Sequence, residues 1–155
     1  MAMTCPRDGS SLASETYEGD VVVDRCPTCR GIWLDAGELK TIQETIERDY
    51  SNQLRQINVV ARAYELARQK SRPEIRCPKC QGALEPREYA YCSQILIDRC
   101  SGCGGVWLDE GELAALEQFF EQAAAEEKDA LEAETRVKQS PLQRGFLASL
   151  WKHLG

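Results

Sequence analysis

A fourteen-residue segment occurs twice in this chain of 155 residues, and it limits what the chain can fold into. The first copy, CPTCRGIWLDAGEL, runs from Cys26 to Leu39, and the second, CSGCGGVWLDEGEL, runs from Cys100 to Leu113. Each copy opens with two cysteines separated by two residues, a spacing typical of metal-binding turns. The repeat indicates small duplicated modules rather than one domain with a single large core.

A second short turn stands upstream of each copy. It reads Cys5-Pro-Arg-Asp8-Gly before the first and Cys77-Pro-Lys-Cys80-Gln-Gly before the second. Each module thus offers four metal ligands in two turns, the spacing of a zinc ribbon. We expect two zinc ions, with these ligands: Cys5, Asp8, Cys26 and Cys29 in the first site, and Cys77, Cys80, Cys100 and Cys103 in the second.

Zinc is favoured over disulfides by the spacing of the cysteines and by the expected compartment. The N-terminus shows no basic stretch followed by an apolar run, and no segment approaches the length of a membrane span. A reducing cytoplasm is therefore the expectation, and there repeated two-residue cysteine spacings indicate a metal. Modules of about 35 residues also need such a staple, because they cannot bury enough apolar surface to fold alone.

The first site departs from the second at one position, where Asp8 replaces the equivalent of Cys80. Three interpretations are open: Asp8 completes the site as a zinc ligand, Asp8 only braces the turn and leaves an open position, or the site is empty. Only an open position would permit catalysis. Cys92, which belongs to neither ligand set, is interpreted as a spare thiol.

Each module is predicted to contain a β-hairpin between its two turns. Residues 12–17 and 21–23 form the hairpin of the first module, and residues 84–91 and 95–99 form that of the second. The hairpin brings the two turns to one end, where their side chains can surround a tetrahedral ion. The predicted fold class is α+β, with two small zinc ribbons that are each followed by an α-helix.

After its second turn each module is predicted to run straight into a helix. Asp35 and Asp109 stand as N-caps, and Glu38 and Glu112, three residues on, complete capping boxes. Capping explains these paired carboxylates better than acid–base catalysis does. Trp33 and Trp107 are expected to cover the small hairpin cores.

These motifs resemble the transcription-factor-IIB-type zinc-finger family of small bacterial proteins, in which CPxC, a hairpin and CPxCxGxWLDxGEL follow one another. The resemblance covers about residues 5–42 and 77–116. It implies a zinc ribbon whose ligands match Cys5, Cys26 and Cys29 and, in the second copy, the four cysteines named above. It implies little about biochemical activity, because binding to nucleic acid or to a polymerase would be an analogy at the level of the fold.

Helices are expected around the second ribbon. Between Leu39 and Ala67 apolar residues recur with a mean period of 3.5, which predicts a long amphipathic helix with a coiled-coil seam. A second, acidic helix is predicted from about Glu110 to Val137. The expected organisation is: zinc ribbon 1 (1–36), linker helix (37–71), zinc ribbon 2 (72–110), acidic helix (111–138) and basic amphipathic tail (139–155).

The tail and the seam suggest partners. The tail has no acidic residue, and its apolar side chains would line one face of a short helix. It is expected to pack on the body, to bind a protein partner, or to contact a membrane surface. The seam over residues 39–67 would pack within the chain, against a partner, or against a second copy in a homodimer. His153, the single histidine, is expected to be exposed.

The predicted function is that of a zinc-binding, non-enzymatic adaptor for an unidentified protein partner. The first alternative is a transcription-associated protein that binds nucleic acid or RNA polymerase, and the second is a metal-dependent enzyme at an open first site. Nucleic-acid binding is disfavoured because the formal net charge is −6, and ionised thiols with two zinc ions would take it to about −9. The cations that it would use are Arg7, Arg25, Arg30, Arg76, Lys79, Arg87 and Arg99.

Overall fold

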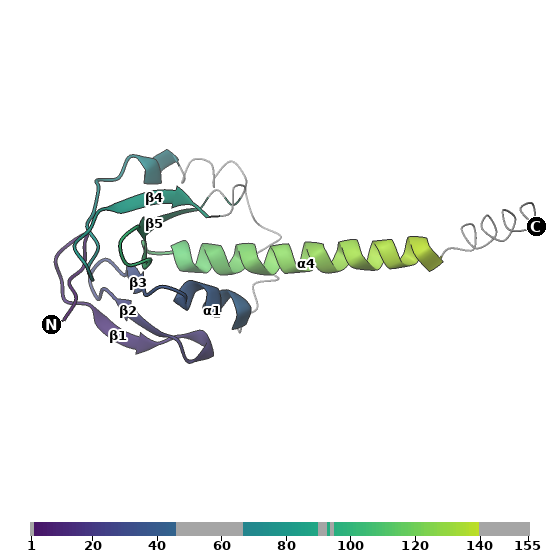
Figure 1. Ribbon diagram of the computed structural model, residues 1–155, viewed down its shortest axis with the longest axis horizontal. Coiled ribbons are helices and arrows are strands. Elements are labelled where there is room, and N and C mark those ends of the chain that lie inside the picture. Colours follow the sequence, from purple (N-terminus) through teal and green to yellow (C-terminus); the bar gives the residue numbers. More distant parts are fainter. Residues whose placement is uncertain (1, 46–66, 90–92, 94, 140–155) are drawn as a thin grey trace, which may run out of the picture. The chain divides into compact units, whose positions relative to one another are not determined.

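The computed structural model describes residues 2–45, 67–89, 93 and 95–139, and the strands of these ranges form one antiparallel sheet (Figure 1). Both ribbons contribute to it, three strands each, and the fold class is α+β as predicted. The strand order across the sheet is β1 (Ala13–Thr16), β2 (Val22–Arg25), β3 (Ile32–Leu34), β6 (Val106–Leu108), β5 (Leu96–Cys100) and β4 (Leu84–Glu88).

Both predicted hairpins form. In the first, β1 pairs with β2 in a register that places Ala13 opposite Arg25, and the turn contains the short 3₁₀ helix η1 (Glu18–Asp20). In the second, β4 pairs with β5 and places Glu85 opposite Arg99. Ala13 and Glu85 occupy the same position of the repeat, as do Arg25 and Arg99, so the two hairpins share one register despite the longer second loop.

The prediction that each module enters a helix directly is wrong, because a third strand comes first. β3 and β6 are only three residues long, and they pair with each other in the middle of the sheet. Trp33 lies opposite Trp107, with Ile32 opposite Leu108 and Leu34 opposite Val106. Since Trp33 and Trp107 are equivalent residues of the repeat, the two ribbons meet about an approximate two-fold axis at this pair.

The two faces of the sheet bury different clusters, because successive side chains of a strand point to opposite faces. One face packs against α1 (Glu38–Thr45) and the start of α4 (Glu112–Gln139) with Leu34, Ile42, Leu108 and Leu116 at its centre. The other face buries Trp33 and Trp107 together with the metal-ligand cysteines. The tryptophans therefore belong to the core around the metal sites, and both are fully buried.

Only half of each predicted capping box forms. The backbone N–H of Asp35 donates to Glu38 Oε2 at 2.6 Å, and that of Asp109 donates to Glu112 Oε2 at 2.8 Å. The aspartate side chains accept instead from the indole N–H of the tryptophan two residues earlier, at 3.0 Å and 3.1 Å. The Asp side chains thus fix the tryptophans, while the Glu side chains hold the backbone before each helix.

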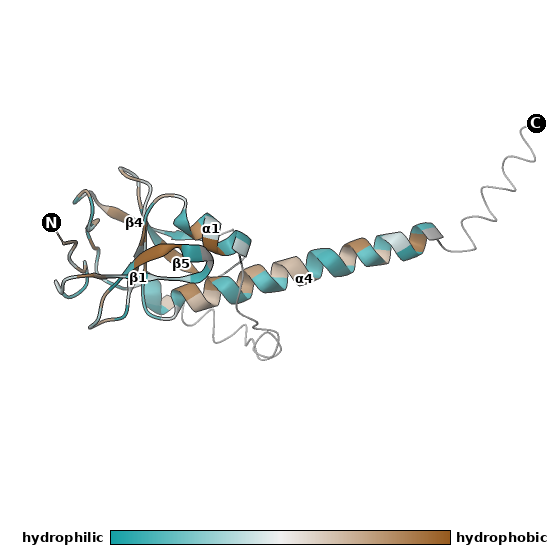
Figure 2. Cartoon of the chain, turned by 90° about the horizontal axis from the view of Figure 1, so that it is seen from below, coloured by the Kyte–Doolittle hydropathy of each residue, from teal (hydrophilic) through white to brown (hydrophobic). Residues whose placement is uncertain are grey.

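The chain divides after Phe120 into two compact units, and α4 continues into the second. Residues 123–138 of α4 are all exposed, and Figure 2 shows hydrophilic stretches recurring along this helix. Among the described residues, no helix is long and apolar enough to cross a membrane. Most of the seam predicted over 39–67, the tail with His153, and Cys92 lie outside the described residues.

Candidate metal centres

Four turns of one geometry carry the eight predicted ligands. In each turn the carbonyl of the first cysteine accepts a hydrogen bond from the N–H four residues on, at 2.9–3.0 Å. Its N–H donates to the carbonyl five residues on, at 2.7–2.9 Å. Both bonds recur from the first cysteine of every turn, namely Cys5, Cys26, Cys77 and Cys100.

The fifth residue of each turn adopts a left-handed backbone conformation. Glycine supplies it at Gly9 (φ 78°) and Gly104 (φ 75°), but Arg30 (φ 62°) and Gln81 (φ 63°) adopt it as well. Residues with a Cβ seldom occupy this region, so the turn imposes it on them. Because all four turns have this conformation at the same position, they present their ligands with the same backbone geometry.

The ligand atoms of each site converge on one point. In both clusters they all lie within 4.8 Å of one another. The sulfurs of Cys77 and Cys103 are 3.6 Å apart, those of Cys80 and Cys100 are 3.4 Å apart, and those of Cys5 and Cys29 are 3.5 Å apart. Zinc–sulfur bonds of about 2.3 Å in a tetrahedron place sulfurs about 3.8 Å apart, so both sites fit zinc.

The seven described cysteines are free thiols, and none forms a disulfide. Thiolate-rich tetrahedral sets are the ligand chemistry of structural zinc. The expectation of two zinc ions in place of disulfides is confirmed by this geometry and by the family described below.

Asp8 lies with the three cysteines of the first site. Its Oδ2 is 3.3 Å from Cys26 Sγ, and its Oδ1 accepts the N–H of Ser10 at 2.8 Å. Hydrogen bonds from Ser10 are the main cause that lowers the pKa of Asp8 and keeps it ionised, with a smaller contribution from Cys26. Ligation by Asp8 stays a prediction, and this arrangement favours it over an open position.

Backbone amides point at the ligand sulfurs. The N–H of Cys103 donates to Cys100 Sγ at 3.5 Å, and this bond lowers the pKa of Cys100 to about 6. Burial has the opposite effect on other thiols, because it raises the pKa of Cys29 and of Cys77 to about 12. A bound zinc ion would deprotonate these thiols, so each site must exchange protons for metal.

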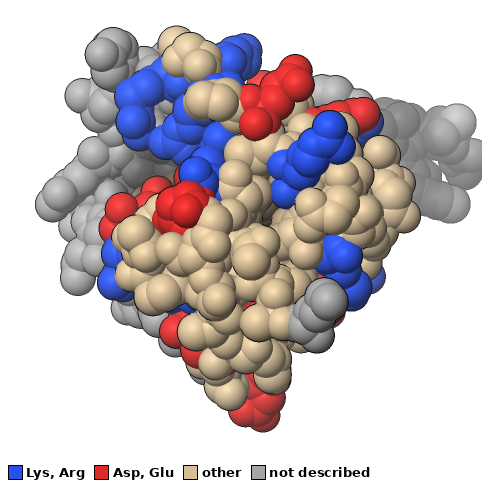
Figure 3. Space-filling view, turned by 90° about the vertical axis from the view of Figure 1, so that its left-hand side faces the viewer, with Lys and Arg blue, Asp and Glu red and all other residues tan. Residues whose placement is uncertain are grey.

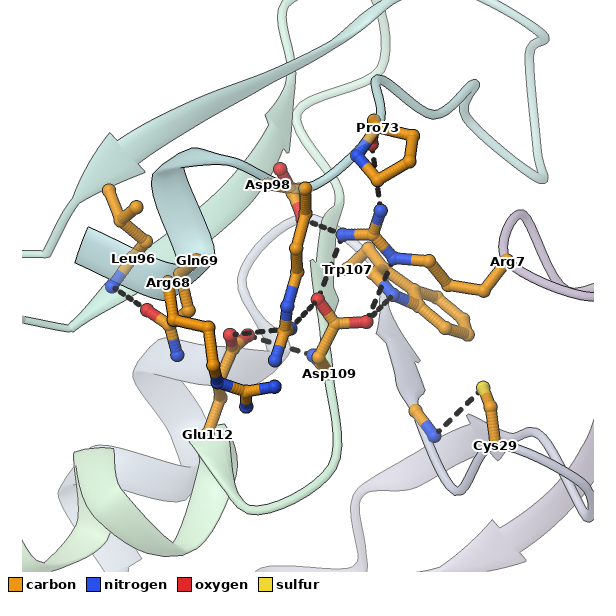
Figure 4. Close-up of polar contacts among 12 residues, drawn as sticks. Arg7, Cys29, Arg68, Gln69, Pro73, Leu96, Asp98, Trp107, Asp109 and Glu112 are labelled. Carbon is orange, nitrogen blue, oxygen red and sulfur yellow. Dashed lines mark hydrogen bonds and ion pairs between the residues drawn. The ribbon is translucent and has the colours of Figure 1, made fainter. Parts of the chain in front are cut away.

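Ion pairs between the ribbons follow the two-fold relationship. Arg7, in a turn of ribbon 1, donates to both oxygens of Asp109 in ribbon 2 at 3.0 Å and 2.8 Å, and also reaches Asp98 at 3.3 Å. Figure 4 shows the Asp109 carboxylate in contact with both the Arg7 guanidinium and the Trp107 indole nitrogen. At the equivalent place in the other ribbon, Lys79 contacts Asp35 at 2.9 Å.

The two pairs differ in burial. The side chains of Arg7 and Asp109 are 17% and 12% exposed, whereas those of Lys79 and Asp35 are 50% and 42% exposed. Arg72 also contacts Asp109, and it lies 3.6 Å from Glu112. The buried pair is therefore part of a network that ties the first metal site to the start of α4.

Sequence reasoning missed the contact that joins the ribbons. Gly31 lies against Trp107, since a Cβ at Gly31 would be 2.2 Å from Trp107 Cζ2. Gly105 lies against Trp33 in the same way, again at 2.2 Å. The signal was present as a glycine and an apolar triplet, Gly-Ile-Trp-Leu and Gly-Val-Trp-Leu, at equivalent positions of both copies.

The cations proposed for nucleic-acid binding are mostly paired with carboxylates. Besides Arg7 and Lys79, the pairs are Arg25 with Glu15, Arg30 with Glu110 at 3.6 Å, and Arg87 with Glu85 at 2.9 Å. Figure 3 shows basic and acidic side chains interspersed on one face of the molecule. Lys and Arg side chains also gather at the upper left of that face, with acidic side chains beside them.

Comparison with known protein families shows to which family the chain is related. The sequence model of the transcription factor zinc-finger family, of the TFIIB zinc-ribbon type, matches residues 4–45 and 76–118, more than half of the chain. The chain belongs to this family. Each matched region contains one complete ligand set, so this member of the transcription factor zinc-finger family carries two tandem ribbons, as the sequence motifs indicated.

A search of curated proteins and a search of solved structures each found no significant match. The family and the ligand geometry together identify a zinc-binding protein with two sites. Zinc ribbons of this type are typically binding modules without catalytic activity.

Proposed function

We propose that this protein is a non-enzymatic adaptor, in which two zinc-stabilised ribbons present helices and a C-terminal segment to a protein partner. One observation carries the proposal: α4 continues for residues 123–138 with every side chain exposed. Leu131 is 64% exposed and Val137 is 57% exposed. Isolated helices gain little stability in water, so contact of these residues with a partner would stabilise the helix.

The chemistry of this helix suits a polar docking surface. Between residues 121 and 139 it carries six acidic and three basic side chains. Ion pairs such as Glu134 with Lys138, at 2.7 Å, support the helix only weakly because both groups are exposed. An acidic helix with isolated apolar side chains is compatible with a partner that offers basic groups around a shallow apolar surface.

The ligand sets support a structural role for zinc. Four donors converge in each site, and a zinc ion with four protein ligands has no open position for a substrate. This favours the adaptor over a metal-dependent enzyme. We also propose a cytoplasmic location, because free cysteines are typical of a reducing compartment.

Binding of nucleic acid or RNA polymerase is the weaker alternative. Its support is the description of the family, and the ion pairing of Arg7, Arg25, Arg30, Lys79 and Arg87 weakens it. Homodimerisation through residues 39–67 and membrane contact by the tail are further proposals. Both segments lie mostly outside the residues that the structure describes.

An affinity pull-down with the intact zinc-loaded chain, run with and without nuclease, tests the adaptor. The test variant is Leu131→Asp with Val137→Asp, and the matched control is Glu126→Ala with Glu127→Ala on the same helix. We expect a protein partner that resists nuclease, is lost with the apolar double variant and is kept with the control. Capture that disappears with nuclease, or that is the same for the apolar double variant, would overturn the proposal.

A further inference from the structure

We infer that a cavity between α1 and strands β4 and β5 is a binding site for a small organic anion. Its volume is about 450 Å³, within the range of small-molecule sites. The residues that matter are Leu39, Ile97 and Val106 on the apolar side, and Lys40, Arg87 and Arg99 on the charged side. The inference is independent of the adaptor role, since it concerns a different surface and ligand.

The apolar side of the cavity is part of the core and is therefore preformed. Ile97 and Val106 are 7% and 8% exposed and pack in the cluster under the helices. Tyr89, the residue after β4, forms part of the wall, and its hydroxyl donates to Gln43 Oε1 of α1 at 3.0 Å. An apolar group could lie on this side without rearrangement of the sheet.

The charged side has an excess of cations in an acidic protein. Three cations line the cavity against one carboxylate, Glu88, whereas the whole chain carries a net charge of −6. Arg87 pairs with Glu85 and Lys40 with Glu44, but these pairs are exposed and thus weak. Within the described part of the chain, Arg99 makes no ion pair. Guanidinium groups bind carboxylates and phosphates through paired hydrogen bonds, so the side chains present here suit an oxyanion.

The equivalent surface of ribbon 1 lacks this cluster of cations. Residues 15 and 87 are equivalent, as are 25 and 99: Glu15 lies opposite Val23, and Arg87 lies opposite Ile97. In ribbon 1 Arg25 is neutralised by Glu15, whereas ribbon 2 has arginine at both positions. Two cations on neighbouring strands repel each other, and a bound anion would offset that repulsion.

Space is created by a second difference between the ribbons. Gly104 lines the cavity in ribbon 2, and its equivalent in ribbon 1 is Arg30, whose side chain reaches Glu110 at 3.6 Å. Both residues adopt the same left-handed turn conformation, so the change removes a side chain without altering the backbone. A neighbouring hollow of about 260 Å³ shares Arg87, Arg99 and Gly104 and extends the site toward Cys100; Glu85, the partner of Arg87, also lines it.

The ligand is thus a small molecule with an oxyanion head group for the arginines and an apolar part for Leu39, Ile97 and Val106. Calorimetric titration of the zinc-loaded full chain with phenyl phosphate and with benzoate separates a phosphate from a carboxylate head group. Benzyl alcohol is the neutral control. We expect one of the two anions to bind at least tenfold more tightly than the alcohol.

Two variants distinguish this site from general attraction of anions. Arg99→Ala should weaken binding about tenfold, as expected for one charge-assisted contact, while Arg25→Ala at the equivalent place in ribbon 1 should leave it unchanged. Gly104→Arg installs the residue that ribbon 1 carries. It raises the net charge by one, yet it should abolish binding because the side chain fills the cavity.

The results that would overturn the site are equally specific. Binding that is unchanged or tighter in Gly104→Arg would mean that anions bind by charge alone. Equal losses in Arg25→Ala and Arg99→Ala, or no binding of either anion to the parent protein, would also reject it. Zinc content and circular dichroism of each variant check the fold, and Lys40→Ala, remote from the ligand turns, replaces any variant that loses zinc and should weaken binding about fivefold.

Discussion

Trp33 and Trp107 lie directly opposite each other where β3 pairs with β6, and each indole packs on the glycine that begins the strand region of the other ribbon. The contact is reciprocal because the two residues are equivalent positions of one repeat. It converts two small modules into a six-stranded sheet with a shared core. The two ribbons are therefore halves of one folded unit, and each half contains one metal site.

The first prediction concerns Gly31. In Gly31→Ala the new Cβ would collide with Trp107 Cζ2, and we expect a loss of about 3 kcal/mol in the free energy of unfolding. Trp107→Phe removes the colliding atom, so the double variant should be more stable than the sum of the two single losses predicts. Denaturant unfolding in excess zinc measures all three variants. Strictly additive losses would show that this contact does not join the ribbons.

The second prediction compares two equivalent ion pairs. Arg7→Ala removes the guanidinium that contacts both Asp98 and Asp109 in a largely buried position, and Arg72 remains beside Asp109, so the free energy of unfolding should fall by about 2 kcal/mol. Lys79→Ala, the matched change at the exposed pair, should have a much smaller effect. Urea denaturation of both variants decides the matter. Similar losses would mean that burial of the Arg7 network contributes little.

The sequence predicts the ligand turns, the hairpins and the family because each depends on local spacing. The cysteine pairs and the Gly-containing loops carry this information directly. The β3–β6 pairing does not depend on local pattern. Its strands are three residues long, and the paired residues stand 72–76 positions apart in the chain, so only the matched glycine and tryptophan positions hint at it.

The side-chain roles of Asp35 and Asp109 also could not be predicted from spacing. A capping box and an aspartate that holds a preceding tryptophan share the same sequence pattern. The choice depends on the packing of Trp33 and Trp107 under the sheet, which presents each indole N–H to the carboxylate. Tertiary contacts therefore decide a role that local propensity leaves open.

The third prediction is a pH effect from Glu112. Burial raises the pKa of Glu112 to about 8, whereas an unfolded glutamate has a pKa of about 4.3. Between these values the folded protein binds a proton that the unfolded chain releases, so stability falls as pH rises. Glu112→Gln should gain stability relative to the parent from about pH 6 to about pH 8, while still accepting the Asp109 N–H.

Denaturation in excess zinc across that pH range measures the Glu112 effect. Glu38→Gln is the matched control, because Glu38 makes the same backbone contact in ribbon 1 and its pKa is also raised by burial, but it is less buried. Its pH-dependent gain should be smaller. A gain for Glu112→Gln that does not change with pH would contradict the assignment.

The fourth prediction is that zinc binding releases protons. Burial raises the pKa of Cys29 and Cys77 to about 12, so both thiols are protonated at neutral pH before metal binds. Zinc affinity should therefore rise with pH. Calorimetric titration of metal-free protein in buffers of different ionisation enthalpy counts the protons. Release of fewer than one proton per zinc would show that the thiols are already ionised.

The central claim is that each ribbon holds one zinc ion, and native mass spectrometry during a chelator titration tests it most directly. We predict two zinc ions per chain, with the first ion lost from the site of Cys5, Asp8, Cys26 and Cys29, because three thiolates and a carboxylate bind zinc less tightly than four thiolates. Asp8→Ala should make that loss easier and leave the second site unchanged. One zinc per chain, or first loss from the four-cysteine site, would contradict the account.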